Sequence, residues 1–237
     1  WALLALAAAP LAVAQDFNWP AKDPDGWLLA FVDVETTGLI PGHHEMIDIG
    51  IVMTDLDGIA IDELFIRLQP EHPERTDEGA RAVNAFDAAQ WREMGALSTD
   101  DAIDRIQTFH TNIAGDRNVL MVAFNSQFDA AFIDQLFRSR DRSWRELYHY
   151  FVLDIPSMAW ALGFRGLTGS SISGTLGIED EPNVSKLLSQ YIVGRALDTS
   201  SFYNAVVAVC DANLDRVPKD GLGKGIGTGK GKTTAAH

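Results

Sequence analysis

The chain has 237 residues, of which 46% are hydrophobic and 22% are charged, and these values are ordinary for a globular protein. Its formal net charge of −14 argues against a generic nucleic-acid coat protein, because such proteins gain most of their affinity from basic side chains. An acidic chain can still act on nucleic acid if metal ions in a carboxylate cluster supply positive charge. The single cysteine, Cys210, excludes an internal disulfide framework.

Residues 1–14 are almost wholly apolar, and the chain turns polar at Gln15. This run is shorter than the roughly 20 residues that span a bilayer, so we expect no stable membrane association. Its length and the small-x-small sequence Ala12-Val13-Ala14 favour a signal peptide removed before Gln15, with a buried helix as the alternative. The first interpretation predicts an exported or periplasmic protein, and the second predicts a cytoplasmic one.

Composition divides the rest of the chain into three parts. Residues 15–26 are rich in Pro, Asp and Gly and are interpreted as a linker. Residues 27–217 carry the periodic apolar patterns of one domain. Residues 218–237 form a Gly/Lys-rich tail that we expect to be flexible.

Within the domain, strand patterns come first and then alternate with helical patterns. The predicted strands are 28–35, 47–55, 59–70, 118–124 and 150–155, with a hairpin turn at Asp57-Gly58. The predicted helical regions are 76–113, a helix capped by Asn125 or Ser126 and ending near Phe137, a helix from Pro156, and 186–215. This order predicts an α/β fold whose mixed sheet has an antiparallel hairpin portion and parallel strands, flanked by helices.

Asp33 and Glu35 are two residues apart at the end of the first predicted strand, so both carboxylates point to the same face. Two acids at the end of an apolar strand repel each other and lose hydration unless cations neutralise them. Taken alone, these two residues are better explained as a polar strand end that points into solvent.

A second acidic position changes this balance. Asn125, Phe128 and Asp129 fall near one face of the helix that follows the 118–124 strand, because their spacings are three and four residues. Asp129 can meet Asp33 and Glu35 if the two strands are neighbours in the sheet. Three carboxylates without a matching Lys or Arg make a hard-oxygen site suited to Mg²⁺ or Mn²⁺.

These segments resemble the motifs of the DEDD (DnaQ-like) 3′→5′ exonucleases. F-V-D-V-E-T-T-G-L (31–39) followed by I-D-I-G (47–50) is similar to the first motif of that family, and V-A-F-N-S-Q-F-D-A-A-F (122–132) is similar to the second. The stretch A-R-A-V-N-A-F-D-A-A-Q-W (80–91) looks like the segment between them. The resemblance covers residues 28–200 and implies a ribonuclease H-like fold.

The resemblance also implies roles for individual residues. Asp33 would bridge two metal ions, Glu35 would help to hold the ion that activates water, and Asp129 would ligate the other ion. The ions would be two Mg²⁺ or Mn²⁺, as in two-metal phosphodiester hydrolysis. The terminal nucleotide would be contacted by Thr36, Thr37, Gly38, Leu39, Asn125 and Phe128.

The third motif of the family, His-x4-Asp or Tyr-x3-Asp, is damaged here. The best local match is G-R-A-L-D-T-S (194–200), which places Gly194 at the position of the general base and Thr199 at the position of the fourth acid. Asp198 is one residue off, about 100° round a helix, and could be a metal ligand only if that helix shifted. His149 is a weaker candidate for the missing base.

Two functions remain open from the sequence. The first is a 3′→5′ exonuclease that acts on 3′ ends of single-stranded DNA or RNA. The second is a catalytically impaired exonuclease-like domain that binds such ends without efficient cleavage. The oligomeric state stays open, with a homodimer among the options because many relatives dimerise.

Several other features favour ordinary structural roles. The arginine run is interpreted as a solvated helix end, and His43-His44 as exposed loop residues near the site. Trp and Phe residues are assigned to core packing. The arginines are Arg138, Arg140, Arg142 and Arg145, and the aromatic residues are Phe65, Phe86, Trp91, Trp144 and Trp160.

Overall fold

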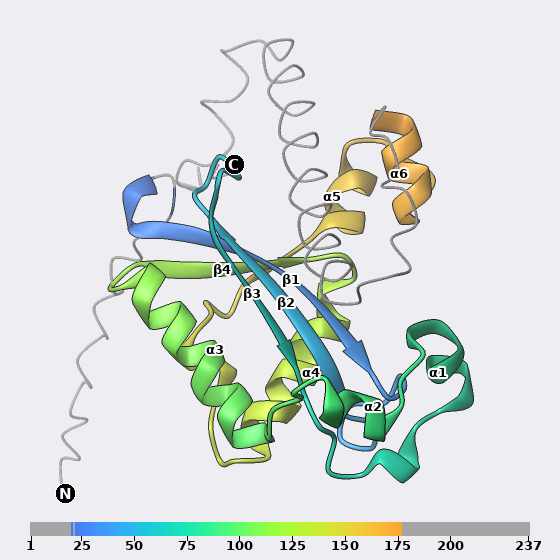
Figure 1. Ribbon diagram of the computed structural model, residues 1–237. Helices are drawn as coiled ribbons and strands as arrows, with labels where there is room; N and C mark the ends of the chain where they lie inside the picture. Colours follow the sequence, from blue (N-terminus) through green and yellow to red (C-terminus); the bar gives the residue numbers. More distant parts are fainter. Residues whose placement is uncertain (1–19, 21, 177–237) are drawn as a thin grey trace, which may run out of the picture.

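The computed structural model describes residue 20 and residues 22–176, which are coloured in Figure 1. Several expectations lie outside the described residues, so they stay predictions. They concern the signal peptide (1–14), the helical region 186–215, the tail (218–237), and Gly194, Asp198, Thr199 and Cys210.

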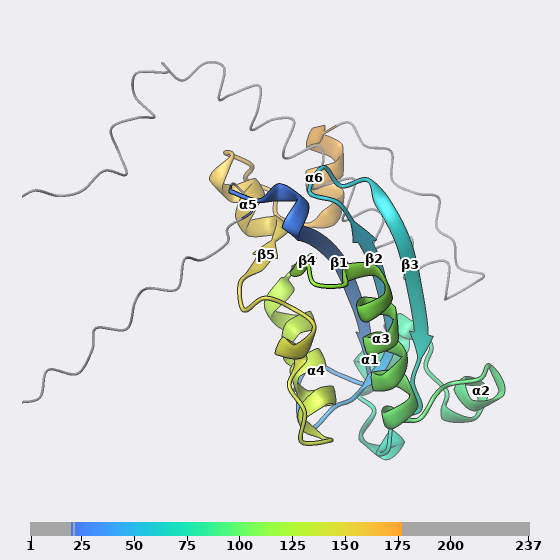
Figure 2. The ribbon, with the colours of Figure 1, turned by 90° about the vertical axis from the view of Figure 1, so that its left-hand side faces the viewer.

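Five strands form one mixed sheet. They are β1 (Trp27–Thr36), β2 (Met46–Thr54), β3 (Ala60–Arg67), β4 (Asn118–Ala123) and β5 (Val152–Asp154). Their order across the sheet is β3-β2-β1-β4-β5 (Figure 2). The pairs β1–β2 and β2–β3 are antiparallel, whereas β1–β4 and β4–β5 are parallel, which confirms the predicted mixed sheet with a hairpin portion.

Helices flank the sheet. The α-helices are α1 (Glu78–Asn84), α2 (Ala88–Glu93), α3 (Thr99–Ala114), α4 (Ser126–Arg138), α5 (Ile155–Ala161) and α6 (Gly169–Leu176). Short 3-10 helices are η1 (Pro24–Gly26), η2 (Pro73–Arg75) and η3 (Trp144–Glu146). In the described part of the chain, no helix has the length and apolar character needed to cross a membrane.

The region expected to be helical from 76 to 113 forms three separate helices. Helix α1 ends at Asn84 because Ala85 adopts a left-handed conformation with φ 55°. A second interruption follows α2 at Gly95, whose φ is 81°. New helices then start at caps, where the side chains of Asp87 and Ser98 accept backbone N–H groups.

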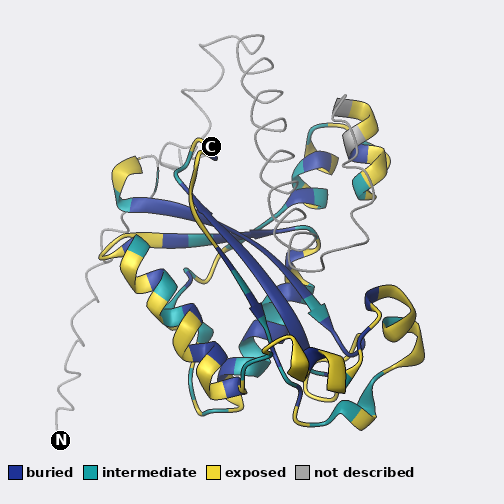
Figure 3. Cartoon of the chain, viewed as in Figure 1, coloured by how far each residue is buried: buried dark blue, intermediate teal, exposed yellow. Residues whose placement is uncertain are grey.

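The two faces of the sheet are separated by the alternation of side chains along β1. Its even-numbered residues, such as Val32, pack in a large core with α3 and α4 (Figure 2). Its odd-numbered apolar residues, Leu29 and Phe31, pack on the other face with Ile155 of α5. The central strands are therefore buried on both sides, as the dark blue in Figure 3 shows. Asp33 and Glu35 continue the odd-numbered series.

Of the aromatic residues assigned to core packing, Trp144 packs against the large core, whereas Phe65 is only partly buried. Phe86 and Trp91 are buried together with ring centroids 5.2 Å apart. Trp160, in contrast, is 53% exposed and lies 4.3 Å from the guanidinium group of Arg165. The assignment of Trp160 to the core was wrong, because the buried residues of the short helix α5 are Ile155 and Ala159.

Candidate active site

The two acidic side chains at the end of β1 share one face of the sheet. Asp33 lies opposite Gly50 of β2, and Glu35 lies opposite Asp48. Asp33 is buried and Glu35 is partly exposed. The sheet geometry thus brings these two residues together as the spacing predicted, on the face opposite α3 and α4.

Asp129 reaches the end of β1 from the first turn of α4. Strand β4 pairs with β1 only along Trp27–Phe31, so within the described residues no strand continues on that side of β1. The Asp129 carboxylate occupies this edge, where its Oδ1 accepts a hydrogen bond from the Val34 backbone N–H at 3.0 Å. Because Val34 lies between Asp33 and Glu35, the structure brings an acid from 95 residues away to the same strand end.

The two residues of the second motif that were expected to contact the terminal nucleotide lie in different environments. Phe128 is partly buried and packs on Phe132, with ring centroids 4.9 Å apart. Asn125 is exposed and has a left-handed conformation with φ 68°. It occupies the N-cap position of α4 but its side chain makes no capping hydrogen bond. The predicted start of the helix is therefore confirmed, whereas the predicted side-chain cap from Asn125 or Ser126 is wrong.

The cap of α4 comes instead from Asp154, which was not predicted from the sequence to belong to the site. The Asp154 Oδ1 accepts the Ser126 N–H at 3.0 Å, and its Oδ2 accepts the Ser157 N–H of α5 at 3.0 Å. The sequence signal was present, because an Asp directly before Ile155-Pro156 marks a helix start. Its second role at α4 depends on the pairing of β4 with β5.

The turn after β1 is fixed by hydrogen bonds to its main-chain carbonyl groups. The Thr36 hydroxyl donates to the Gly38 carbonyl at 2.7 Å, and the Asn84 side-chain amide donates to the Thr36 carbonyl at 2.8 Å. The Thr37 carbonyl accepts the Asp77 N–H at 2.7 Å. Helix α1 therefore holds the proposed nucleotide-contacting turn, while Leu39 beyond it is 78% exposed.

His44 is buried and packs against this turn, so its assignment as an exposed loop residue was wrong. Its Nδ1 accepts the Ile40 N–H at 3.0 Å. A Cβ at Gly38 would lie 2.6 Å from atoms of the His44 ring, which leaves room only for glycine. His43 is exposed, as expected.

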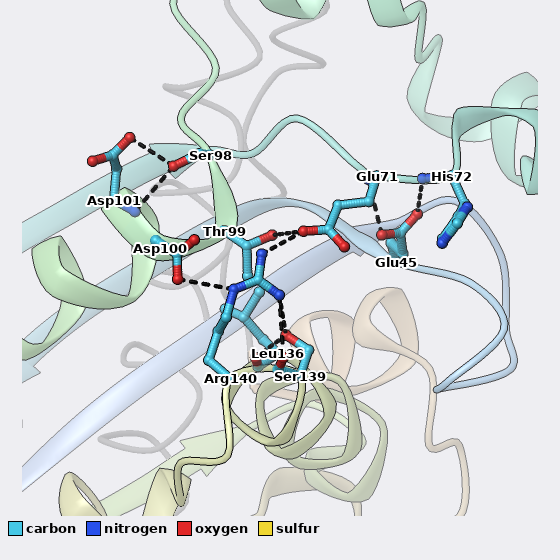
Figure 4. A network of polar contacts seen from close by, with 10 residues as sticks. All are labelled: Glu45, Glu71, His72, Ser98, Thr99, Asp100, Asp101, Leu136, Ser139 and Arg140. Carbon is cyan, nitrogen blue, oxygen red and sulfur yellow. Dashed lines mark hydrogen bonds and ion pairs between the residues drawn. The ribbon is translucent and has the colours of Figure 1, made fainter.

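A polar network continues from this turn to α3 and the end of α4 (Figure 4). The Glu45 carboxylate accepts the backbone N–H groups of Glu71 at 2.9 Å and His72 at 2.7 Å. Arg140 pairs with Glu71 and with Asp100 of α3.

Most of the arginine run has carboxylate partners. Arg138 pairs with Asp134, Arg140 with the network just described, and Arg142 with Glu146. The run was interpreted as a solvated helix end, and none of its four arginines is buried, although only Arg138 belongs to α4. Most of its positive charges are compensated within the protein.

Asp48 is a second acidic residue near the site whose role was not predicted from the sequence. It is fully buried directly opposite Glu35, and its Oδ1 lies 3.0 Å from Nε of Arg67. Burial raises the pKa of Asp48 to about 7, against the opposing effect of Arg67, and the charge of Glu35 adds to the increase. The Arg67 guanidinium also stacks 4.7 Å from the ring of Trp91.

His149 does not approach the acidic residues. Its backbone N–H donates to the Val119 carbonyl. The centroid of its ring lies 5.2 Å from that of Trp27, which is at the opposite end of β1 from Asp33. The structure therefore gives no support to His149 as a substitute base.

The donor chemistry of the site fits a hard divalent cation. Asp33 and Asp129 are buried carboxylates, and Glu35 is a partly exposed one. Burial of such groups is costly unless hydrogen bonds or a cation compensate. Within residue 20 and residues 22–176, however, no group of three or more Asp, Glu, His or Cys side chains is arranged to hold a metal ion.

The architecture is that of the ribonuclease H-like fold found in exonuclease I. The zinc-bound form of the E. coli exonuclease I complex with single-stranded DNA matches with a TM-score of 0.60 and 16% identity, over 82% of this chain and 44% of that one. E. coli exonuclease I in complex with a dT13 oligonucleotide matches with a TM-score of 0.63 and 14% identity, over 80% of this chain and 43% of that one.

These similarities concern structure, and at such identities they establish the fold. The chain spans less than half the length of the exonuclease I chains that it matches. In sequence, no protein-family model and no curated protein matches it.

Proposed function

We propose that this chain is a 3′→5′ exonuclease that hydrolyses phosphodiester bonds at the 3′ ends of single-stranded DNA or RNA. The observation that carries this proposal is the hydrogen bond from Val34 N–H to Asp129, between Asp33 and Glu35. The ribonuclease H-like fold supports it, because the matched exonuclease I structures hold single-stranded DNA.

Asp33, Glu35 and Asp129 would hold two Mg²⁺ or Mn²⁺ ions, with Asp198, outside the described residues, as a further ligand. Such ions, when bound, stabilise the attacking and leaving oxygens of an in-line displacement. The protein supplies fixed carboxylates for them: β1 sets the direction of two, and the Val34 N–H holds the third.

The end of the substrate would be held at the turn Thr36-Thr37-Gly38. The exposed side chain of Leu39 supplies an apolar surface for a terminal base, and Phe128 and Asn125 supply an aromatic ring and an amide from α4. Contacts to the flat faces of bases accept any base, so we expect weak sequence preference.

The second candidate is a catalytically impaired domain that binds 3′ ends, and the sequence at Gly194 and Thr199 favours it. Loss of a general base typically costs about 10²–10⁴-fold in rate. Binding of metal ions and of single strands would survive this loss, because both depend on the described acids and the turn after β1.

Purified full-length protein with Mn²⁺ and a 5′-labelled single-stranded oligonucleotide separates the candidates. The exonuclease predicts stepwise shortening that Asp33→Ala and Asp129→Asn abolish. Asp62→Asn, which changes an exposed acid on β3, is the matched control and should shorten the oligonucleotide normally. Titration calorimetry with Mn²⁺ alone gives a second measurement.

Metal-dependent binding of the oligonucleotide without shortening would establish the impaired domain. If neither Mn²⁺ binding nor shortening occurs, or if Asp33→Ala leaves both unchanged, the proposal is refuted.

A further inference from the structure

Helix α4, which carries Asp129, begins without a cap from its own sequence. The residue at its N-cap position, Asn125, makes no side-chain capping bond and has a left-handed backbone conformation that disfavours most side chains. The first helical residue, Ser126, is 3% exposed, so its N–H group cannot rely on bulk water. A helix start of this kind needs an acceptor from elsewhere in the fold.

Asp154 at the end of β5 is that acceptor. Its Oδ1 accepts the Ser126 N–H at 3.0 Å across 28 residues of sequence. Its Oδ2 accepts the Ser157 N–H at 3.0 Å and the Ser157 hydroxyl, so the same carboxylate also caps α5. A negative charge at the start of α4 is further stabilised by the helix dipole.

The position of Asp129 follows from this contact. Ser126 and Asp129 belong to the same first turn and are separated by about 4.5 Å along the helix axis. Movement or fraying of that turn would carry the Asp129 carboxylate away from the Val34 N–H. Even a small displacement would break the 3.0 Å hydrogen bond between them, because hydrogen bonds tolerate little change in geometry.

We propose that Asp154 is a positioning residue of the candidate active site, which holds the first turn of α4 so that Asp129 stays on the edge of β1. Asp154 acts through Ser126 and does not need to touch substrate. The catalytic consequence rests on the proposed nuclease function, whereas the structural link between Asp154 and Val34 does not.

Amide hydrogen exchange, measured residue by residue by NMR on the full-length protein, tests the structural link. In Asp154→Ala we expect the Val34 amide to exchange roughly fivefold faster or more, relative to the amide of Ala30, because one N-cap has been lost. Ala30 lies in the part of β1 that is paired with β4 and serves as the internal reference. Asp154→Asn keeps one acceptor oxygen and should give an intermediate rate.

Two controls separate this link from general destabilisation. Ser98→Ala removes the cap of α3 and should lower stability without a selective change at Val34. Ser157→Ala removes the hydroxyl contact on the α5 side and leaves the Ser126 contact in place. An unchanged ratio of Val34 to Ala30 exchange in Asp154→Ala would overturn the proposal.

The nuclease assay provides the second readout. Misplacement of Asp129 by about 1 Å should lower kcat on the order of 10²-fold with a smaller change in KM, and Asp154→Asn should recover part of the loss. If the wild-type protein shows no shortening but Asp154→Ala still releases the Val34 amide, the nuclease proposal fails and the positioning role stands. A changed exchange rate with full kcat would contradict the catalytic consequence.

Discussion

The buried pair of His110 and Tyr148 should make the stability of this domain sensitive to acid. His110 Nε2 lies 2.9 Å from the Tyr148 hydroxyl, and both residues are 3% exposed. The His110 Nδ1 is buried without a hydrogen-bond partner among the described residues. Protonation would place a charge there, so burial lowers the pKa of His110 from 6.5 to about 4.

The sign and size of the effect follow from proton linkage. Between pH 6.5 and pH 4 the unfolded chain binds a proton at His110 that the folded protein does not bind, so stability falls as the pH falls. With these two pKa values the His110 contribution decreases by about 2 kcal/mol between pH 7 and pH 5. Asp48 acts in the opposite direction, because its raised pKa favours the folded state at lower pH.

A comparison with the double variant His110→Phe/Tyr148→Phe isolates the His110 contribution. The variant removes both polar groups together, which avoids leaving one of them buried alone, and it retains Asp48. Urea unfolding of both proteins at pH 7 and pH 5 should show that the wild type loses about 2 kcal/mol more than the variant. Equal losses in the two proteins would refute the reasoning, and His72→Gln, at an exposed histidine, should behave as the wild type.

Two further changes probe the turn after β1. Gly38→Ala should lower the free energy of unfolding by about 1–3 kcal/mol, because the new Cβ would lie 2.6 Å from the His44 ring. In a double-mutant cycle, Gly38→Ala should cost much less stability when His44→Ala has removed the ring. If the two substitutions have strictly additive effects on the free energy of unfolding in urea, the clash is contradicted. Asn84→Ala should cost about 1–3 kcal/mol by leaving the buried Thr36 carbonyl without its 2.8 Å donor. An unchanged urea midpoint would show that this bond does not hold the turn.

The acids of the site were predictable to different degrees. Asp33 and Glu35 followed from the two-residue period of a strand, which is a local property. Asp48 was overlooked because a single acid in an apolar strand has no local partner, and its Arg67 is supplied by the neighbouring strand β3. Asp154 was recognisable as a helix start, but its contact with Ser126 spans 28 residues.

The sequence by itself determined the alternation of strands and helices, the mixed character of the sheet and the strand end that carries Asp33 and Glu35. Side-chain periodicity and turn residues encode these features within a few neighbouring positions. Only the tertiary structure decided that Asp129 lies at the Val34 N–H, that His44 is buried, and that α4 is capped by β5. These contacts depend on which strands become neighbours and where β4 stops beside β1, because each joins groups that are distant or differently exposed in the chain.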